Sequence, residues 1–301
     1  MNQPYCKSTS RQITRIVVIG ACLNMGLAAL KLIAGIVIGS ASLVADAIHS
    51  LSDLFTDAIV LIGSRLSLRP ADESHPYGHG RYDTLSSTIV GVVLVVAGVY
   101  IVWDAGQSLY RQEHSNPGAI VLIVALVAIA SKEWLYRVTR RISVQVNSAA
   151  LRANAWHHRS DALSSVAVLL GAFAGLLGWG HGDQVAAIAV GFMVGAVGLG
   201  AMWSSFVEFT EGAISPSERS LIEEAIRQVP GIKGWHRMRT RIVGREAFMD
   251  IHVLVDPALS VVEGHKVCTA VEEAIEGAVH RPINVTVHCE PEDGIESTEN
   301  S

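Results

Sequence analysis

The chain has 301 residues, of which 50% are hydrophobic and 17% charged, and its formal net charge is −5. With a mean hydropathy of +0.37, this composition is more apolar than that of ordinary soluble globular proteins. The negative charge is modest, and nothing in the sequence resembles a basic surface for nucleic acid. We therefore expect a membrane chain with a smaller water-soluble part.

Six apolar segments follow one another along residues 1–209. Each is close to the 20 or so residues that a helix needs to cross the hydrocarbon core of a bilayer. We therefore predict an α-helical membrane protein with six transmembrane helices. The segments run from Ile13 to Ile38, Leu43 to Leu66, Leu85 to Trp103, Pro117 to Tyr136, Ala149 to Trp179 and Val185 to Phe209.

Basic residues gather beside alternate ends of these segments, and the opposite loops hold only Arg111. Because basic loops stay on the cytoplasmic side, this pattern predicts cytoplasmic N- and C-termini. The expected location is the inner (plasma) membrane, which the pattern itself does not identify. The basic groups lie before helix 1, between helices 2 and 3, and between helices 4 and 5. They are Lys7, Arg11 and Arg15; Arg65, Arg69 and Arg81; and Lys132, Arg137, Arg140, Arg141 and Arg152.

Hydropathy falls after Thr210, where a cytoplasmic domain over residues 210–290 is predicted, followed by a disordered tail over 291–301. Ser215 and Pro216 provide a helix start, with Ser215 as the cap. The periodicity predicts an α+β domain of order αββαβ, like a metallochaperone, with both helices on one face of a small sheet. The expected elements are 216–229 (helix), 235–243 and 247–255 (strands), 261–279 (helix) and 283–289 (strand).

Two of the apolar segments each carry a histidine and an aspartate four residues apart, His49 with Asp53 and His157 with Asp161. Residues i and i+4 share a helix face, and an ionisable group at bilayer depth costs at least about 2.5 kcal/mol. Two facing helices would offer two nitrogen and two oxygen ligands, a set that suits tetrahedral Zn²⁺. The alternative is that the pairs satisfy one another and hold the helices together. Asp57, on the same stripe, is expected to be solvated near a helix end.

A short polar loop between helices 2 and 3, predicted to be cytoplasmic, contains Asp72, His75 and His79 within eight residues. Gly78 and Gly80 give the backbone freedom to bend so that these side chains converge. Three such ligands with an open position make a labile metal site. Short histidine-containing loops also occur without metal, so both readings stay open.

The C-terminal domain contributes four histidines and a carboxylate. Alternation along the last two strands places the His252 and His288 side chains away from the apolar face, and Glu290 on the same side as His288. Together these residues could hold two metal ions if Glu290 bridges them, unless they are ordinary surface residues. The predicted ligands are His236, His252, His265, His288 and Glu290.

With these motifs in this order, nearly the whole chain resembles the cation diffusion facilitator family. The resemblance rests on the segment 46–53 (DAIHSLSD), the loop from His75 (HPYGHG), the segment 157–161 (HHRSD) and the histidine-bearing C-terminal domain. It implies a homodimer that exports divalent metal ions in exchange for protons, and not an enzyme. It also implies a transport site in helices 2 and 5, metal sites in the loop and C-terminal domain, and a charge interlock between Arg81 and Glu211.

Metal identity and the function class have alternatives. The all-His-Asp transport site resembles that of the zinc-preferring members, although Fe²⁺, Mn²⁺, Cd²⁺ or Co²⁺ could be the substrate instead. A membrane-anchored metal sensor or scaffold would not need ligands at mid-membrane depth, and a passive channel would need weaker sites. The sequence contains no HExxH run of a metalloprotease and no GxxxxGK loop for ATP.

Overall fold

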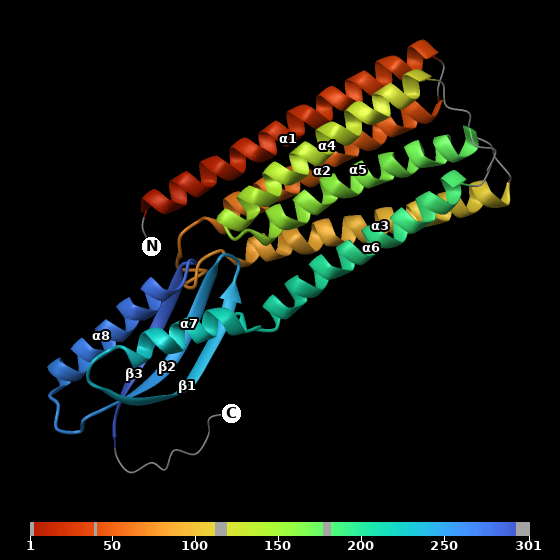
Figure 1. Ribbon diagram of the computed structural model, residues 1–301. Coiled ribbons are helices and arrows are strands. Elements are labelled where there is room, and N and C mark those ends of the chain that lie inside the picture. Colours follow the sequence, from red (N-terminus) through yellow and green to blue (C-terminus); the bar gives the residue numbers. More distant parts are fainter. Residues whose placement is uncertain (1–2, 39–40, 112–118, 177–181, 293–301) are drawn as a thin grey trace. The chain divides into compact units, whose positions relative to one another are not determined.

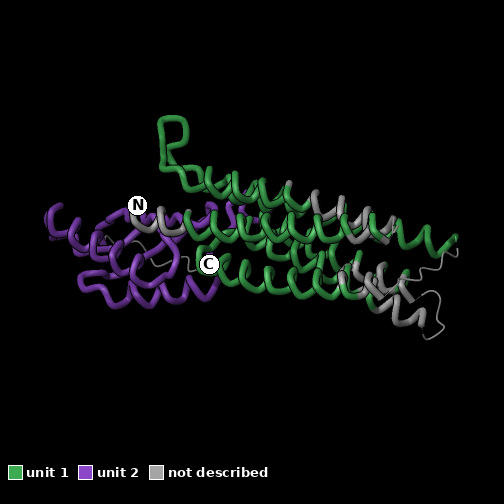
Figure 2. Tube along the Cα trace, turned by 90° about the horizontal axis from the view of Figure 1, so that it is seen from above, with its two compact units in different colours: residues 1–205 green, residues 206–301 purple. Residues whose placement is uncertain are grey.

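The computed structural model describes residues 3–38, 41–111, 119–176 and 182–292. Some side chains within the helices, among them all those of residues 41–52, lie outside the described set. The chain forms two compact units, residues 1–205 and 206–301 (Figure 2).

The first unit is built from long helices that run side by side (Figure 1). The shortest have 27 residues, so at about 1.5 Å per residue each is about 40 Å long and exceeds the hydrocarbon thickness of a bilayer. Helices are present at all six predicted positions. They are α1 (Gln3–Ile38), α2 (Ala41–Ser67), α3 (Arg81–Tyr110), α4 (Ala119–Gln145), α5 (Ala149–Leu176) and α6 (Gly182–Phe209), the last of which continues into the second unit. Helices α1, α2, α3 and α6 extend beyond their apolar runs, α4 extends at its C-terminal end, and the described part of α5 ends at Leu176.

Three segments of the described residues are both long and apolar enough to cross a membrane, namely Arg11–Ile33, Arg81–Tyr110 and Gly191–Phe209. They belong to α1, α3 and α6. The other long helices carry polar groups inside their apolar stretches, for example Asp53 in α2 and Lys132 in α4. Crossing of the membrane by all six helices therefore stays a prediction.

The first unit buries polar side chains and exposes apolar ones. Asn24, Asp57 and His158 are at most 1% exposed, whereas Val99 and Phe192 are 65% and 67% exposed. An apolar core lies inside as well, formed by residues such as Ile13, Val60, Val90, Leu94, Leu135 and Leu151. Large exposed apolar residues beside a buried polar interior are what a bundle surrounded by lipid requires.

Helices α3 and α6 approach each other closely through glycine. A Cβ atom added at Gly98 would lie 2.6 Å from the carbonyl oxygen of Gly191, and one added at Gly91 would lie 3.0 Å from that of Gly198. Small residues spaced along both helices allow this backbone contact, which in lipid replaces the missing hydrophobic driving force between helices.

Gly98→Ala should therefore destabilise the first unit. The new methyl group meets backbone rather than a flexible side chain, so the helices must separate, at a cost of about 1–3 kcal/mol. Thermal unfolding of the purified protein in detergent measures this loss. Gly106→Ala, also in α3 but with no atom within 4 Å of the added Cβ, is the matched control. Equal melting temperatures for the two variants would contradict the close α3–α6 packing.

The second unit has the predicted αββαβ order. Its elements are α7 (Pro216–Arg227), β1 (Ile232–Val243), β2 (Glu246–Val255), α8 (Val261–Ala278) and β3 (Ile283–Pro291). The sheet order is β1-β2-β3, with β1 antiparallel and β3 parallel to β2. Met249, Ile251 and Val253 alternate along the buried face of β2 and share one core with Ile226 of α7 and Ile275 of α8. Both helices thus cover the same face of the sheet, and the opposite face carries the histidines.

Both helices of the second unit begin with a capping box, in which a serine side chain and a glutamate side chain each bind the other residue's backbone N–H. Ser215 and Glu218 form one box and Ser260 and Glu263 the other. Glu218 also accepts a hydrogen bond from Arg281 Nε at 2.8 Å. Burial opposes ionisation of Glu218, but the Ser215 hydrogen bonds and the Arg281 charge outweigh it and lower the pKa of Glu218 below its ordinary value.

Glu218→Gln should lower the free energy of unfolding of the second unit by about 0.5–1 kcal/mol at pH 7, through loss of a first-turn charge and an ion pair. Because the folded-state pKa is lowered, this stabilisation is complete above the unfolded value near 4.5 and is lost as pH falls through the folded value. Urea unfolding at pH 7 and at pH 3 measures it. Glu276→Gln, which changes an exposed residue of α8, is the control. If the loss of unfolding free energy caused by Glu218→Gln were larger at pH 3 than at pH 7, the stabilising role of ionised Glu218 would be contradicted.

Candidate metal centres

Three groups of metal-ligating side chains converge among the described residues. In each group, ligand atoms from three residues lie within 4.8 Å of one another. One group lies inside the helical unit, one in the loop between α2 and α3, and one on the open face of the sheet. They are Asp53, His157 and Asp161; Asp72, His75 and His79; and His236, His252 and Glu290.

The first group joins α2 to α5. His157 and Asp161 lie one turn apart on α5, and His157 Nε2 is 3.3 Å from Asp53 Oδ1 and 3.9 Å from Asp161 Oδ2. Asp53 and His157 are buried, and neither ring nitrogen of His157 makes a hydrogen bond to a described residue. A buried imidazole that has no hydrogen-bond partner among the described residues and lies beside two carboxylates is suited to ligating a cation. The side chain of His49, one turn before Asp53 on α2, lies outside the described residues.

Lys132, predicted to lie between helices 4 and 5, belongs to this group. Lys132 Nζ lies 2.7 Å from Asp53 Oδ2 and 2.8 Å from Asp161 Oδ2, and its side chain is 3% exposed. The assignment of Lys132 to a cytoplasmic loop is wrong, because α4 continues through Arg137, Arg140 and Arg141 to Gln145 and turns only at residues 146–148. The sequence feature that could have indicated this position is that Lys132 lies inside the apolar run that ends at Tyr136.

A second buried polar cluster lies one turn along α2 from Asp53. Asp57 accepts hydrogen bonds from Asn24 Nδ2 at 3.0 Å and Asn154 Nδ2 at 2.9 Å, and His158 Nε2 lies 3.8 Å from Asp57 Oδ1. The expectation that Asp57 is solvated is therefore wrong. Amide donors from α1 and α5 replace water around its carboxylate.

The loop group folds around Asp72. Its carboxylate accepts hydrogen bonds from the hydroxyl and N–H of Ser74 and the N–H of His75, and these lower the pKa of Asp72 to about 2. His79 Nε2 lies 3.4 Å from Asp72 Oδ2, and the His75 and His79 rings are 4.4 Å apart. Gly78, at φ +81°, makes the bend, whereas Gly80 has helical dihedrals. The loop thus brings its three predicted ligands together with the carboxylate already ionised.

The third group lies across the sheet. His236, His252 and His288 are neighbours in register on β1, β2 and β3. The carboxylate of Glu290 reaches all three: Oε2 is 2.9 Å from His236 Nε2, and Oε1 is 2.7 Å from His252 Nδ1 and 3.4 Å from His288 Nε2. Burial opposes ionisation of Glu290, but the His252 hydrogen bond and the histidine charges outweigh it and lower the pKa of Glu290. Because its two oxygens face different histidines, the carboxylate has the placement of a bridging ligand.

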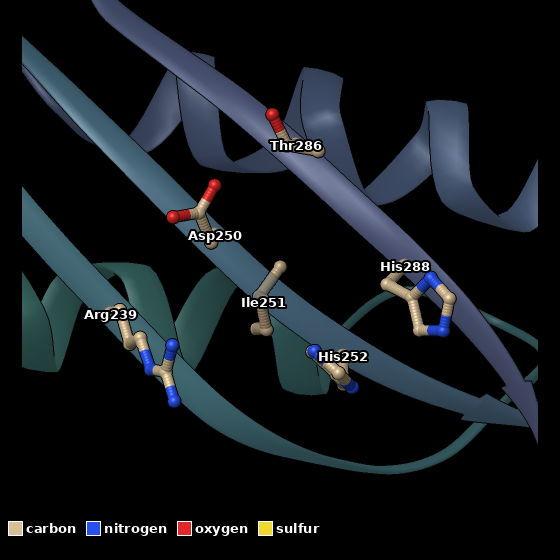
Figure 3. A pocket seen from close by; sticks show the side chains of 6 residues that line it. All are labelled: Arg239, Asp250, Ile251, His252, Thr286 and His288. Atoms are coloured by element: carbon tan, nitrogen blue, oxygen red, sulfur yellow. The ribbon is translucent and has the colours of Figure 1, made fainter.

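His265 does not join this group. It is exposed on α8, which packs on the opposite face of the sheet from His252. Residues not predicted as ligands instead adjoin the cluster: Arg239, Asp250 and Thr286 line a hollow of about 390 Å³ together with His252 and His288 (Figure 3).

The predicted interlock between Arg81 and Glu211 joins residues of different units and stays a prediction. Within the second unit, Glu211 Oε2 lies 3.4 Å from Arg241 Nε.

Glu290→Ala should weaken Zn²⁺ binding by the third group at least tenfold, since even an outer-shell partner of a metal ligand contributes about that much. Calorimetric titration of the full chain carrying Asp53→Ala and Asp72→Ala, which disable the other groups, measures this affinity. In the same background His265→Ala is the matched control and should bind as before. An equal loss in both variants would show that the ligand set on the sheet is wrong.

The family profile described as "Cation efflux transmembrane domain" matches residues 17–210, and that described as "Cation efflux protein, cytoplasmic domain" matches residues 214–292.

Among individual relatives, the chain is similar to metal tolerance protein C1 of Arabidopsis thaliana, 33% identical over 91% of this chain and 61% of the plant protein. It is also similar to the magnetosome protein MamM of Magnetospirillum gryphiswaldense, 31% identical over 96% of this chain and 91% of that protein. A solved MamM CTD in a nickel form is 30% identical over 26% of this chain and 100% of that structure, with a TM-score of 0.25.

Proposed function

The chain belongs to the cation diffusion facilitator family, and from this premise we propose that it exports Zn²⁺ from the cytoplasm in exchange for protons. Members of this family are membrane-integral transporters of divalent metal cations. The zinc preference, the proton exchange and the assignment of residues are our proposals. They rest above all on the convergence of Asp53, His157 and Asp161 inside the helical unit.

The donor set supports zinc. One imidazole and two carboxylates supply nitrogen and oxygen ligands, and His49, one turn before Asp53 on α2, is the proposed fourth ligand. Zn²⁺ accepts such a tetrahedral set readily, whereas Mn²⁺ favours sites richer in oxygen. Fe²⁺, Cd²⁺ and Co²⁺ also accept mixed nitrogen and oxygen ligands and are the alternative substrates.

Proton exchange follows from the chemistry of the same ligands. Metal binding requires a neutral imidazole and ionised carboxylates, so protons and Zn²⁺ compete for one site. If α2 and α5 open alternately to the two sides of the membrane, a proton gradient displaces the metal on the outer side. No nucleotide is needed for this cycle.

We further propose six membrane spans, cytoplasmic termini, and a homodimer in the inner (plasma) membrane. The basic residues that end α2 and α4 support this orientation through the positive-inside rule. The second unit, which matches the family's cytoplasmic domain, carries the sheet group. Metal bound at Glu290 and its histidines would regulate export by drawing two protomers together, with Arg81 and Glu211 as the interlock near the membrane.

Zinc flux into proteoliposomes with an imposed pH gradient tests the transport site. Asp53→Ala and Asp161→Ala should each reduce gradient-driven flux at least a hundredfold, because each removes a charged ligand from a buried site. Asp104→Asn, an exposed aspartate of α3, is the control and should leave the flux unchanged.

Unchanged flux in both aspartate variants would contradict the assignment of the transport site to α2 and α5. Zinc flux that does not depend on the pH gradient would contradict proton exchange but would leave the assignment of the transport site intact. If the protein carried Fe²⁺ or Mn²⁺ but no Zn²⁺, the substrate would be that metal and not zinc.

A further inference from the structure

Lys132 occupies the place between the two carboxylates where the proposed function puts a metal ion. Its ammonium contacts one oxygen of Asp53 and one of Asp161, at 2.7 and 2.8 Å. In the described loop and sheet groups, by contrast, the carboxylates pair with histidines. The group inside the helical unit thus has a cation of its own.

We propose that Lys132 is a tethered counterion that fills the transport site between cycles and is displaced when the metal binds, so that it sets the metal affinity. This inference rests on the proposed function, since it assigns a role within the same site. Lys132 is then an affinity-determining residue of the transporter and not a metal ligand.

The geometry makes lysine and metal competitors for the same atoms. Oδ2 of Asp53 and Oδ2 of Asp161 come from different helices, and a metal ion that joins α2 to α5 must bind oxygens of both. Zn²⁺ lies about 2.0–2.2 Å from carboxylate oxygens, well inside the space that the ammonium now occupies. A Zn²⁺ ion bound to both of these Oδ2 atoms would therefore compete with the ammonium for the same space.

The charge balance of the site also favours displacement of the Lys132 ammonium when the metal binds. With neutral His157, two carboxylates and one ammonium leave the empty site with a single negative charge, which is less costly to bury than two. A divalent ion bound with the ammonium still in place would leave a net positive charge in a poorly polarisable interior. Once the ammonium withdraws, the same ion is neutralised by the two aspartates.

The lysine side chain suits this movement. Its charge lies at the end of a flexible four-carbon stem with a rotatable ammonium, unlike the rigid, forked guanidinium of arginine. When the metal leaves, the ammonium can return and keep the carboxylates paired. Such a counterion weakens metal binding but favours release, which a transporter needs as much as capture.

A purely structural lysine would hold α4 against α2 and α5 and have no effect on metal affinity beyond any damage to the fold. The competing-cation role instead predicts that removing the charge tightens binding. Only the competing-cation role predicts tighter metal binding, so the Zn²⁺ affinity of a variant without the charge distinguishes the two roles.

The test is calorimetric titration of Zn²⁺ at pH 7.5 into the detergent-purified full chain carrying His79→Ala and Glu290→Ala, which disable the other groups. Lys132→Met, which keeps the length and loses the charge, should bind Zn²⁺ at least tenfold more tightly. Lys132→Arg keeps the charge and should not bind more tightly. In proteoliposomes the methionine variant should show a lower KM and a lower maximal rate, since release becomes slow.

If Lys132→Met is too unstable for calorimetry, the effect of Zn²⁺ on its thermal unfolding provides a second measurement. With the competitor gone, Zn²⁺ should raise the melting temperature of this variant by more than that of the parent chain. Equal or weaker Zn²⁺ binding by folded Lys132→Met would overturn the proposal and leave a structural lysine. Failure of the parent chain to carry zinc would instead overturn the proposed function, whatever Lys132→Met does.

Discussion

Two aspartates inside an apolar helical bundle, Asp53 buried and Asp161 partly buried, form the constraint on which the first unit depends. Asp53 and Asp161 come from different helices, and an ionised carboxylate away from water needs a cation or hydrogen-bond donors beside it. In the structure that cation is Lys132 of α4, with His157 at the edge of the group. The same requirement for positive charge holds three helices together and makes the site receptive to a divalent ion.

The two units reach stability by different means. The helical unit exposes apolar side chains, buries polar groups in hydrogen-bonded or ion-paired clusters, and brings α3 and α6 together through glycines such as Gly98. The second unit is organised like a soluble domain, with capping boxes, an alternating strand pattern and one apolar core. That core leaves the other face of the sheet free for His236, His252 and Glu290.

Periodicity and spacing predicted much of this arrangement. The apolar runs gave the six helices, and the i, i+4 pair on α5 correctly placed His157 and Asp161 on one face. Lys132 lies inside the apolar run that ends at Tyr136, but nothing local in the sequence shows that its side chain meets Asp53 and Asp161 instead of belonging with the arginines that follow it. Likewise, no local pattern shows that α8 carries His265 away from the sheet face, or that Asn24 and Asn154 meet Asp57. Those contacts depend on tertiary packing between distant segments.

The most direct test of the central claim is the position of zinc in the loaded protein. An anomalous difference map recorded at the zinc absorption edge, from crystals of the zinc-bound protein, locates each ion without reference to function. We predict a peak between Asp53, His157 and Asp161, with Lys132 Nζ withdrawn from both carboxylates. Peaks confined to the loop and sheet groups, with Lys132 still between the two aspartates, would contradict the claim that metal crosses the membrane at this site.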